Sequence, residues 1–267
     1  MQKFCLGIQK SINFEAEIMN QKEYLCRIGI EKTEIYADLA SLNFLQRQHL
    51  LHIPFENLDI HWHRPIILDT DKFYRKIVEE KRGGFCYELN GLFFKLLENV
   101  DFNGKIISAR VFNGKDFGAE YDHLAIIINI ADEEFLVDVG FGSFTSKPLK
   151  FVLDIEQTDE NGVFLIRKYD DEYFEVVKKD GENWESEYIF SDIKRELSEF
   201  TEMCNFHQTS AKSNFTRQKI CSLMTIDGRK TLTAAKFIET KGEQKNESEV
   251  NSDEMFNQIL AREFQIR

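Results

Sequence analysis

The sequence predicts an α+β protein in which helices come first and strands follow. Three observations support this prediction. Apolar residues recur at helical spacing through the first third of the chain, β-branched runs broken by turns fill the middle, and the last quarter mixes both patterns. The chain has 267 residues, of which 42% are hydrophobic, so it can form one large domain or two to three smaller ones with a substantial core.

Four helices are expected in the first third of the chain. Gly29 ends the first and Pro54 the second, because glycine favours helix C-termini and proline cannot continue a helix. Residues 69–71 can cap the third. The expected helices cover residues 20–28, 33–53, 73–81 and 86–98.

Strands are expected in the middle of the chain, where β-branched and aromatic residues gather between turn residues. They cover residues 106–112, 123–130, 135–139, 151–153, 162–169 and 173–178.

The last quarter combines a hairpin with helices. Asp227 and Gly228 form a strong hairpin turn, and Ser252 can cap a terminal helix. The polar, charged segment 241–251 is expected to be mobile. The expected elements are a helix over residues 191–205, strands over 220–226 and 230–237, and a helix over 253–264.

Charge and cysteine content argue against several classes of protein. The net charge of −12 disfavours nucleic acids and anionic membranes as general partners, and no apolar run is long enough to predict a membrane-spanning helix. Five cysteines, an odd number without a CxxC pair, disfavour a disulfide framework and fit a reducing cytoplasm. Residues 1–18 lack a signal-peptide pattern, and we expect them to be a dispensable N-terminal extension.

Cys86 is the first candidate for chemistry. Gly83 and Gly84 interrupt the chain just before it, and the helix that follows places the thiol at a helix N-terminus. Unpaired backbone N–H groups there lower the pKa of a thiol, and the thiolate is the nucleophile. A lone cysteine is more often a small residue packed in the core, so the assignment depends on its partners.

The hairpin of residues 123–139 brings two such partners together. His123 opens its first strand and Asp138 lies near the end of its second, so antiparallel pairing sets the two side by side. The aspartate needs a partner because burying a lone carboxylate is costly. The pair favours a Cys-His-Asp triad in which Asp138 orients His123. The sequence does not determine whether the hairpin faces Cys86.

The other histidines of the first third do not predict a metal site. They lack acidic or cysteine ligands at zinc spacing, so we expect hydrogen-bonded or exposed side chains and no metal. The histidines concerned are His49, His52, His61 and His63.

Several motifs along the chain resemble the arylamine N-acetyltransferase family. The run 82–90, Arg-Gly-Gly-Phe-Cys-Tyr-Glu-Leu-Asn, resembles the nucleophile motif of that family. His123 follows Cys86 by 37 residues and precedes Asp138 by 15, which is close to the spacing of the family's triad. The other similar segments are His49 with residues 53–58, 137–142, 213–216 and 221–223, and the resemblance covers residues 20–265.

The resemblance implies a three-domain fold around a transglutaminase-like or papain-like Cys-His-Asp core. After the extension 1–18, a helical domain of residues 19–105 would carry the nucleophile. A central β-barrel of residues 106–205 would carry His123 and Asp138, and residues 206–267 would form a C-terminal α/β lid.

The resemblance also implies a ping-pong acetyl transfer. Cys86 would take the acetyl group of acetyl-CoA, and acetyl-Cys86 would pass it to an arylamine, arylhydrazine or N-hydroxyarylamine while His123 handles the proton. The implied ligands are therefore two small molecules, the acetyl-CoA donor and the amine.

Further candidate residues concern the ligands. Phe55 and Phe141 are candidates for an aryl pocket, and their alternative is an ordinary core position. Gly142 is a candidate for acetyl-CoA because a missing side chain admits a ligand near the backbone, although a turn explains it equally. Lys212 and Ser213 are candidates for CoA phosphates, with a solvated loop as the alternative for Lys212.

Charged residues near the nucleophile motif form the last group of candidates. The resemblance implies that Arg82 and Glu56 form a buried structural pair, since arginine cannot serve as a general base. Glu88 either joins that pair or is a solvated helix residue. Asp122, directly before His123, departs from the small or hydroxyl residue usual in the family, which puts the contacts to CoA in question.

Two other functions remain open on the sequence alone. The same triad order serves cysteine hydrolases and amide-forming acyltransferases on a transglutaminase-like core. A family member that has lost catalysis would instead be a small-molecule or CoA-binding protein.

Overall fold

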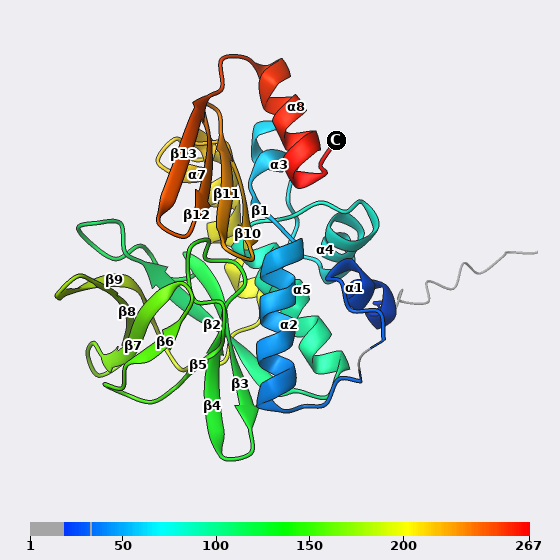
Figure 1. Cartoon of the computed structure of the whole chain (residues 1–267). Coiled ribbons are helices and arrows are strands. Elements are labelled where there is room, and N and C mark those ends of the chain that lie inside the picture. Colours follow the sequence, from blue (N-terminus) through cyan, green and yellow to red (C-terminus); the bar gives the residue numbers. More distant parts are fainter. Residues whose placement is uncertain (1–18, 33) are drawn as a thin grey trace, which may run out of the picture.

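Two antiparallel sheets and the helices packed against them make up the computed structural model, which describes residues 19–32 and 34–267 (Figure 1). The predicted mixed fold, with helices first and strands after, is confirmed. The extension that we expected to be dispensable, residues 1–18, lies outside the described residues. No helix in the described ranges is long and apolar enough to cross a membrane.

The first third of the chain is helical, with two shifted boundaries and one helix, α3 (Leu58–His61), that was not expected. The second helix begins at Leu39 and not near Thr33, because the Asp38 carboxylate caps it by accepting the backbone N–H of Ser41 at 2.8 Å. The third helix starts one residue after its cap Asp69 and continues as a π-helical turn, η1. The elements are α1 (Gln21–Arg27), α2 (Leu39–His52), β1 (Phe55–Glu56), α3 (Leu58–His61), α4 (Thr70–Tyr74), η1 (Arg75–Glu79) and α5 (Cys86–Asn99).

An eight-stranded sheet curves into a nearly closed barrel. Its strand order is β5-β4-β3-β2-β9-β8-β7-β6, so β5 and β6 are the two edges. The Gln157 side chain of β6 joins these edges by bonding both the backbone N–H and the carbonyl of Lys150 in β5, at 2.7 and 2.9 Å. The strands are β2 (Asn103–Val111), β3 (His123–Ile130), β4 (Glu133–Val137), β5 (Leu149–Lys150), β6 (Gln157–Asp159), β7 (Gly162–Lys168), β8 (Phe174–Asp180) and β9 (Asn183–Phe190).

Strand β3 is buried on both faces, which explains its unbroken apolar sequence. Leu124 and Ile126 pack into the core shared with α5, whereas Ala125 and Ile127 pack into the barrel. Successive side chains of a strand point to opposite faces. His123 therefore lies on the same face as Ala125 and Ile127, and its ring contacts barrel residues.

A five-stranded sheet and α8 (Asp253–Phe264) form the last part of the chain (Figure 1). Its order is β1-β10-β11-β12-β13, so the N-terminal strand β1 supplies one edge and pairs Phe55 with Ser222. The Ser252 cap and the span of α8 agree with the sequence prediction. The remaining strands are β10 (Ile220–Thr225), β11 (Gly228–Thr233), β12 (Lys236–Lys241) and β13 (Gln244–Glu249).

Several predicted elements of the second half were wrong. Segment 244–249 is the paired strand β13, because backbone bonds to β12 hold an edge strand whose exposed side chains are polar. The strand expected over 230–237 is two strands with a turn between them. Residues 191–196 are not helical, and helical structure begins only with η2 (Leu197–Phe200) and continues through α6 (Thr201–Thr209) and the short α7 (Asn214–Arg217). The strand expected over 151–153 does not form, because the paired residues are those just before it, β5, and neither β6 nor β9 was anticipated.

His49 of α2 is buried without a hydrogen-bond partner, contrary to our expectation of a hydrogen-bonded or exposed histidine. Its ring packs edge-on against Tyr24 and Phe93, at centroid separations of 6.1 and 5.0 Å. Burial, aided by the charges of Arg27 and His52, lowers the pKa of His49 to about 3. The folded protein therefore holds this imidazole neutral.

This neutral imidazole makes the protein sensitive to acid. Between pH 3 and pH 6.5 the unfolded chain binds a proton at His49 that the folded chain does not, so stability is complete above pH 6.5 and falls as the pH decreases. The loss is roughly 2 kcal/mol between pH 7 and pH 5. We expect His49→Leu to lack this part of the loss in urea denaturation at the two pH values. The exposed control His63→Asn should keep the wild-type loss, and an equal loss in all three proteins would contradict the assignment.

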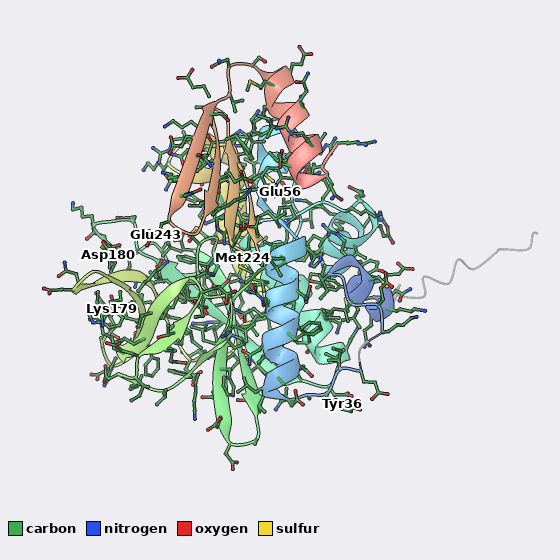
Figure 2. All side chains as sticks on the ribbon, in the orientation of Figure 1. Tyr36, Glu56, Lys179, Asp180, Met224 and Glu243 are labelled. Carbon is green, nitrogen blue, oxygen red and sulfur yellow. The ribbon has the colours of Figure 1, made fainter. Side chains whose placement is uncertain are left out.

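Five buried charges, here called the ion cluster, lie beneath the turn that precedes α5. Arg82 Nη2 contacts Glu56 at 2.6 Å and Asp59 at 3.0 Å. Lys76 Nζ contacts Asp59 at 2.8 Å and Glu88 at 2.9 Å. Although burial opposes its charge, the three carboxylates raise the pKa of Lys76 above its ordinary value. Glu56 belongs to β1, the edge strand of the five-stranded sheet (Figure 2), so the cluster joins β1, α3, η1 and α5.

Without Lys76, the three carboxylates of the ion cluster would share one cation, Arg82. Two negative charges would then be buried without compensation. We expect Lys76→Met to lower the free energy of unfolding by about 3–5 kcal/mol, because breaking one partner of a buried ion pair exposes the others to the full cost of burial. Urea denaturation measures this value. The exposed Lys72→Met on the preceding turn is the matched control and should change stability by less than about 0.5 kcal/mol. A similar small change in Lys76→Met would contradict a structural role for the cluster.

Candidate active site

The start of α5 presents Cys86 through a turn that only glycine can form. A Cβ on Gly83 would lie 2.0 Å from the carbonyl oxygen of Pro54, and Gly84 pairs with Phe55 in a parallel bridge. Phe85 N–H donates to the Glu88 carboxylate at 3.1 Å, which closes the first turn of the helix. Glu88 is buried and bonded to Lys76, so of its two expected roles it takes the one in the ion cluster.

Asp138 joins His123 to the nucleophile helix. Its Oδ2 lies 2.6 Å from His123 Nε2, and both side chains are buried. Its Oδ1 accepts hydrogen bonds from Asn90 Nδ2 and from the backbone N–H of Gly140, each at 2.8 Å. Asn90, one turn after Cys86 on α5, also donates to Leu124 O and accepts from Val139 N–H. The contact between His123 and Asp138 is therefore the one expected from the hairpin.

Gly140 brings the strand after Asp138 against the nucleophile. A Cβ at this position would lie 2.8 Å from the Cα of Cys86 and 2.9 Å from Asn90 Nδ2. Any side chain here would push the loop away from α5. The backbone of the loop after Asp138 thus packs directly on Cys86. The hairpin of residues 123–139 therefore does face Cys86, which the sequence did not determine.

The protonation of Cys86 differs from the expectation. Its side chain is 3% exposed, and burial raises the pKa of the thiol well above its ordinary value. The carboxylates of Asp122 and Asp138 raise the pKa further, whereas a backbone hydrogen bond at Leu124 lowers it. The lowering of the thiol pKa expected from the N-terminus of α5 does not outweigh burial and the two carboxylates. Ionisation of Cys86 therefore needs a proton acceptor that remains beside the sulfur as a cation, and His123, the residue before Leu124, is suited to this.

A cavity of about 740 Å³ contains most of the predicted site residues. Its walls come from the starts of α5 and β3, the loop after β4, the α6–α7 segment and the β10–β11 hairpin. Asp138, Glu56 and Arg82 do not line it and lie behind the walls. The predicted residues that line the cavity are Phe55, Cys86, His123, Phe141, Gly142, Lys212 and Ser213.

Aromatic rings surround the histidine in this cavity. The ring of Phe141 packs edge-on to His123 at a centroid separation of 5.1 Å, and Tyr188 lies at 5.5 Å. The rings of Phe55 and Phe215 are tilted against each other at a centroid separation of 6.2 Å. The rings of Phe141 and Tyr188 pack against the imidazole, and Phe55, Phe141 and Phe215 supply apolar surface to the cavity that Cys86 lines.

Asp122 has a partner that sequence reasoning missed. Its Oδ1 lies 3.2 Å from His207 Nε2, and His207 Nδ1 lies 3.2 Å from Ser213 Oγ. All three residues line the cavity. Ser213 Oγ also accepts the N–H of Phe215 and so caps α7. No local pattern marks His207, because it lies 85 residues from Asp122 in the sequence.

Two further observations concern cations. In the described ranges, no three His, Cys, Asp or Glu side chains are grouped so that they could hold a metal ion.

Arg229 of β11 lines the cavity and was not anticipated, because nothing in the sequence of the hairpin distinguishes it from a surface arginine.

Comparison with known proteins gives relatives of one family. The sequence model of an N-acetyltransferase family matches residues 38–267. A pineal-gland arylamine N-acetyltransferase isozyme of Gallus gallus is 31% identical over 93% of this chain and 94% of its own. The arylamine N-acetyltransferase of Escherichia coli is 30% identical over 81% of this chain and 80% of its own.

Solved structures of the same family share the fold. The arylamine N-acetyltransferase of Salmonella typhimurium superposes with a TM-score of 0.85 at 26% identity, over 92% of this chain and 90% of that one. The enzyme of Mycobacterium smegmatis gives a TM-score of 0.86 at 25% identity, over 93% of both chains. The family match over most of the sequence, together with relatives at 30% identity or more, shows that this chain belongs to the arylamine N-acetyltransferase family.

Proposed function

We propose that this chain transfers an acetyl group from acetyl-CoA, through acetyl-Cys86, to the nitrogen of an arylamine, arylhydrazine or N-hydroxyarylamine. The single observation that supports this proposal most is the joint position of Cys86 and His123 in one cavity, with Asp138 bonded to His123 at 2.6 Å. A nucleophile, a base and a group that orients the base are the parts that such chemistry requires.

In the first half-reaction, Cys86 accepts the acetyl group. Because His123 Nε2 is bonded to Asp138, its Nδ1 is the nitrogen left to take the thiol proton. The thiolate attacks the thioester carbonyl, a new sulfur–carbon bond forms, and the sulfur–carbon bond to CoA breaks. The imidazolium returns the proton to the leaving CoA thiolate. One thioester replaces another, so the step costs little free energy.

In the second half-reaction, the amine nitrogen attacks acetyl-Cys86. His123 takes the proton that the nitrogen loses, the bond between carbon and the Cys86 sulfur breaks, and the thiolate is released. The product is an amide, which is more stable than the thioester and makes the step favourable. Asp138 holds the imidazole in place throughout and stabilises its charged form.

The lining of the cavity supports an aryl acceptor. Phe55 and Phe141 offer ring faces and edges beside the reacting residues, and such contacts contribute about 0.5–1.5 kcal/mol each beyond burial. Water, the acceptor in a cysteine hydrolase with the same triad, gains nothing from this surface. We therefore prefer acyl transfer to hydrolysis.

Three other residues that line the cavity are the proposed contacts for acetyl-CoA. Gly142 has a φ of +80° and open space where a Cβ would stand. Lys212 is exposed, and among the described residues it forms no ion pair, so its ammonium is free for a phosphate. Ser213 lines the same cavity, but its hydroxyl already accepts the N–H that caps α7. We therefore assign it no more than one contact to CoA, from its backbone or its hydroxyl.

The domain organisation and the setting in the cell are part of this proposal. The division into residues 19–105, 106–205 and 206–267 follows the two sheets with two exceptions: β1 joins the sheet of the third part, and β2 begins at Asn103, inside the first part. A reducing cytoplasm agrees with Cys26, Cys86, Cys204 and Cys221, which are all free thiols.

The acyl-enzyme gives the direct test. Incubation with acetyl-CoA should add one acetyl group to the protein by intact mass, located on Cys86 by peptide mapping, and a following arylamine should remove it as the amide. Cys86→Ala should remain unmodified, whereas the exposed Cys26→Ser is the matched control and should acetylate like the wild type. An unmodified wild-type protein that hydrolyses esters or peptides would identify a hydrolase. A Cys86→Ala variant that keeps full turnover would mean that the triad is not catalytic.

Asn90 provides a test of the support behind the triad. We expect Asn90→Ala to lower kcat roughly 10- to 100-fold with a smaller change in KM, because Asp138 and the Gly140 loop lose the amide that positions them. Asn205→Ala, at an exposed position of α6, is the control and should leave both constants near those of the wild type. Urea denaturation of both variants separates this effect from unfolding. A fall in the apparent kcat that merely follows the loss of folded protein, with KM unchanged, would assign Asn90 a structural role only.

A further inference from the structure

Asp122 places a carboxylate in the cavity that contains the nucleophile, and the surrounding backbone is shaped to hold it. Its Oδ2 accepts the backbone N–H of Val111 at 3.3 Å, so the end of β2 fixes one oxygen. A Cβ on Gly118 would lie 2.3 Å from that oxygen, so a side chain at this position would displace the carboxylate. Asp122 and Cys86 line the same cavity. The carboxylate is therefore a built part of the site.

The charge of Asp122 opposes the ionisation of Cys86. Burial raises the pKa of the Cys86 thiol, and the charge of Asp122 raises it further, ahead of that of Asp138. A thiolate and a carboxylate repel each other more strongly in a partly buried site than they would in water. Asp138 has His123 as its partner. The carboxylate that needs a second partner is therefore that of Asp122.

His207 of α6 is this partner. Its Nε2 lies 3.2 Å from Asp122 Oδ1 and 3.3 Å from the backbone carbonyl oxygen of Asp122. Both oxygens are acceptors, so Nε2 carries a hydrogen and donates it. Nδ1 lies 3.2 Å from Ser213 Oγ, which accepts the N–H of Phe215 and has its own hydrogen left for Nδ1. Contacts at both nitrogens thus fix the imidazole.

The contact between His207 and Asp122 lies close to both members of the reacting pair. The buried ring of His207 packs tilted against Tyr87 at a centroid separation of 6.1 Å. Tyr87 directly follows Cys86, and its hydroxyl donates to the backbone carbonyl of Asp122 at 3.3 Å. Asp122 in turn directly precedes His123. His207 therefore acts on a charge that is one residue from the catalytic histidine.

The other titratable side chains near Cys86 or in its cavity do not compensate this carboxylate. Among the described residues, none of them forms a hydrogen bond or an ion pair with the Asp122 side chain. They are Tyr87 of α5, His123 of β3, Asp138 after β4, Cys204 of α6, Lys212 after α6 and Arg229 of β11.

We infer that His207 is a positioning residue for the nucleophile: it fixes the Asp122 carboxylate and offsets its charge, so that Cys86 can pass its proton to His123 at neutral pH. This inference rests on the proposed role of Cys86 as the acyl acceptor. Without His207, an uncompensated negative charge would stand beside the reacting pair. Whichever member of the pair loses its first proton, that loss is harder next to the negative charge.

Alkylation of Cys86 by iodoacetamide, located by peptide mapping and measured against pH, tests the inference without any acyl donor, because the thiolate is the species that reacts. We expect His207→Leu to move the midpoint of the rate profile upward by roughly half a unit to one unit, which slows alkylation below the midpoint about three- to tenfold. His207→Gln keeps an N–H donor and should shift the midpoint less. A change in access to the cavity would instead scale the rate at every pH.

Variants of Asp122 decide whether His207 acts through this carboxylate. Asp122→Asn removes the charge and should not raise the midpoint. In the Asp122→Asn background, His207→Leu should have no measurable further effect, since the charge that it uncovers is gone. Asn205→Leu, at an exposed position of α6, and Asp116→Asn, in the loop before β3, are the matched controls and should keep the wild-type midpoint. Urea denaturation checks that each variant is folded, and His207→Gln with its double variant repeats the comparison if His207→Leu is not.

The outcomes separate this inference from the proposed function. A wild-type midpoint in His207→Leu and His207→Gln would overturn the inference. An upward shift that persists in the Asp122→Asn background would also overturn it, because His207 would then act on the reacting pair directly. Either result, together with formation of acetyl-Cys86 by intact mass, leaves acetyl transfer intact. The expected shifts in a protein that forms no acetyl-Cys86 would contradict the proposed function alone.

Discussion

The buried carboxylate of Asp138 is the interaction on which the arrangement of the site depends. A charge at this depth is tolerated only when donors surround it, and the three donors come from different segments: His123 from β3, Asn90 from α5 and the backbone of Gly140. Because each donor is fixed by its own element, satisfying one carboxylate sets the distance between the helix that carries Cys86 and the sheet that carries His123. The packing of Gly140 against the Cys86 backbone completes this junction.

The ion cluster provides the corresponding constraint on the other side of α5. Three carboxylates and two cations are buried there, and the turn before Cys86 passes over them. Replacing such a cluster by apolar residues need not weaken a protein, but removing one member of it does. Its geometry ties β1 to α3, η1 and α5, and β1 in turn belongs to the five-stranded sheet. The nucleophile turn is thus connected to the last part of the chain as well as to the first.

The distribution of charge in the cavity differs from that of the whole protein. The chain carries a net charge of −12, yet Lys212 and Arg229 border the cavity without ion pairs in the described structure. Asp122, the departure from the family pattern, is engaged by His207 and so does not face a ligand as a free carboxylate. Burial of Cys86 favours the neutral thiol, and in the proposed reaction His123 accepts its proton. These features together favour a site that receives anionic ligands and ionises its nucleophile only as part of a pair.

The sequence by itself determined the succession of elements, the helix that begins at Cys86, the hairpin of His123 and Asp138, and the family. These features are local, or depend on residues in fixed order, so periodicity, caps and turns suffice to find them. Tertiary structure alone decided the rest. Strand β13 is a strand because β12 pairs with it, since its own polar side chains carry no strand pattern. The pKa of Cys86 is set by burial and by carboxylates from other elements, not by its helix N-terminus. His207 and Arg229 reach the cavity only through folding, because their partners lie 85 and 87 residues away in the chain.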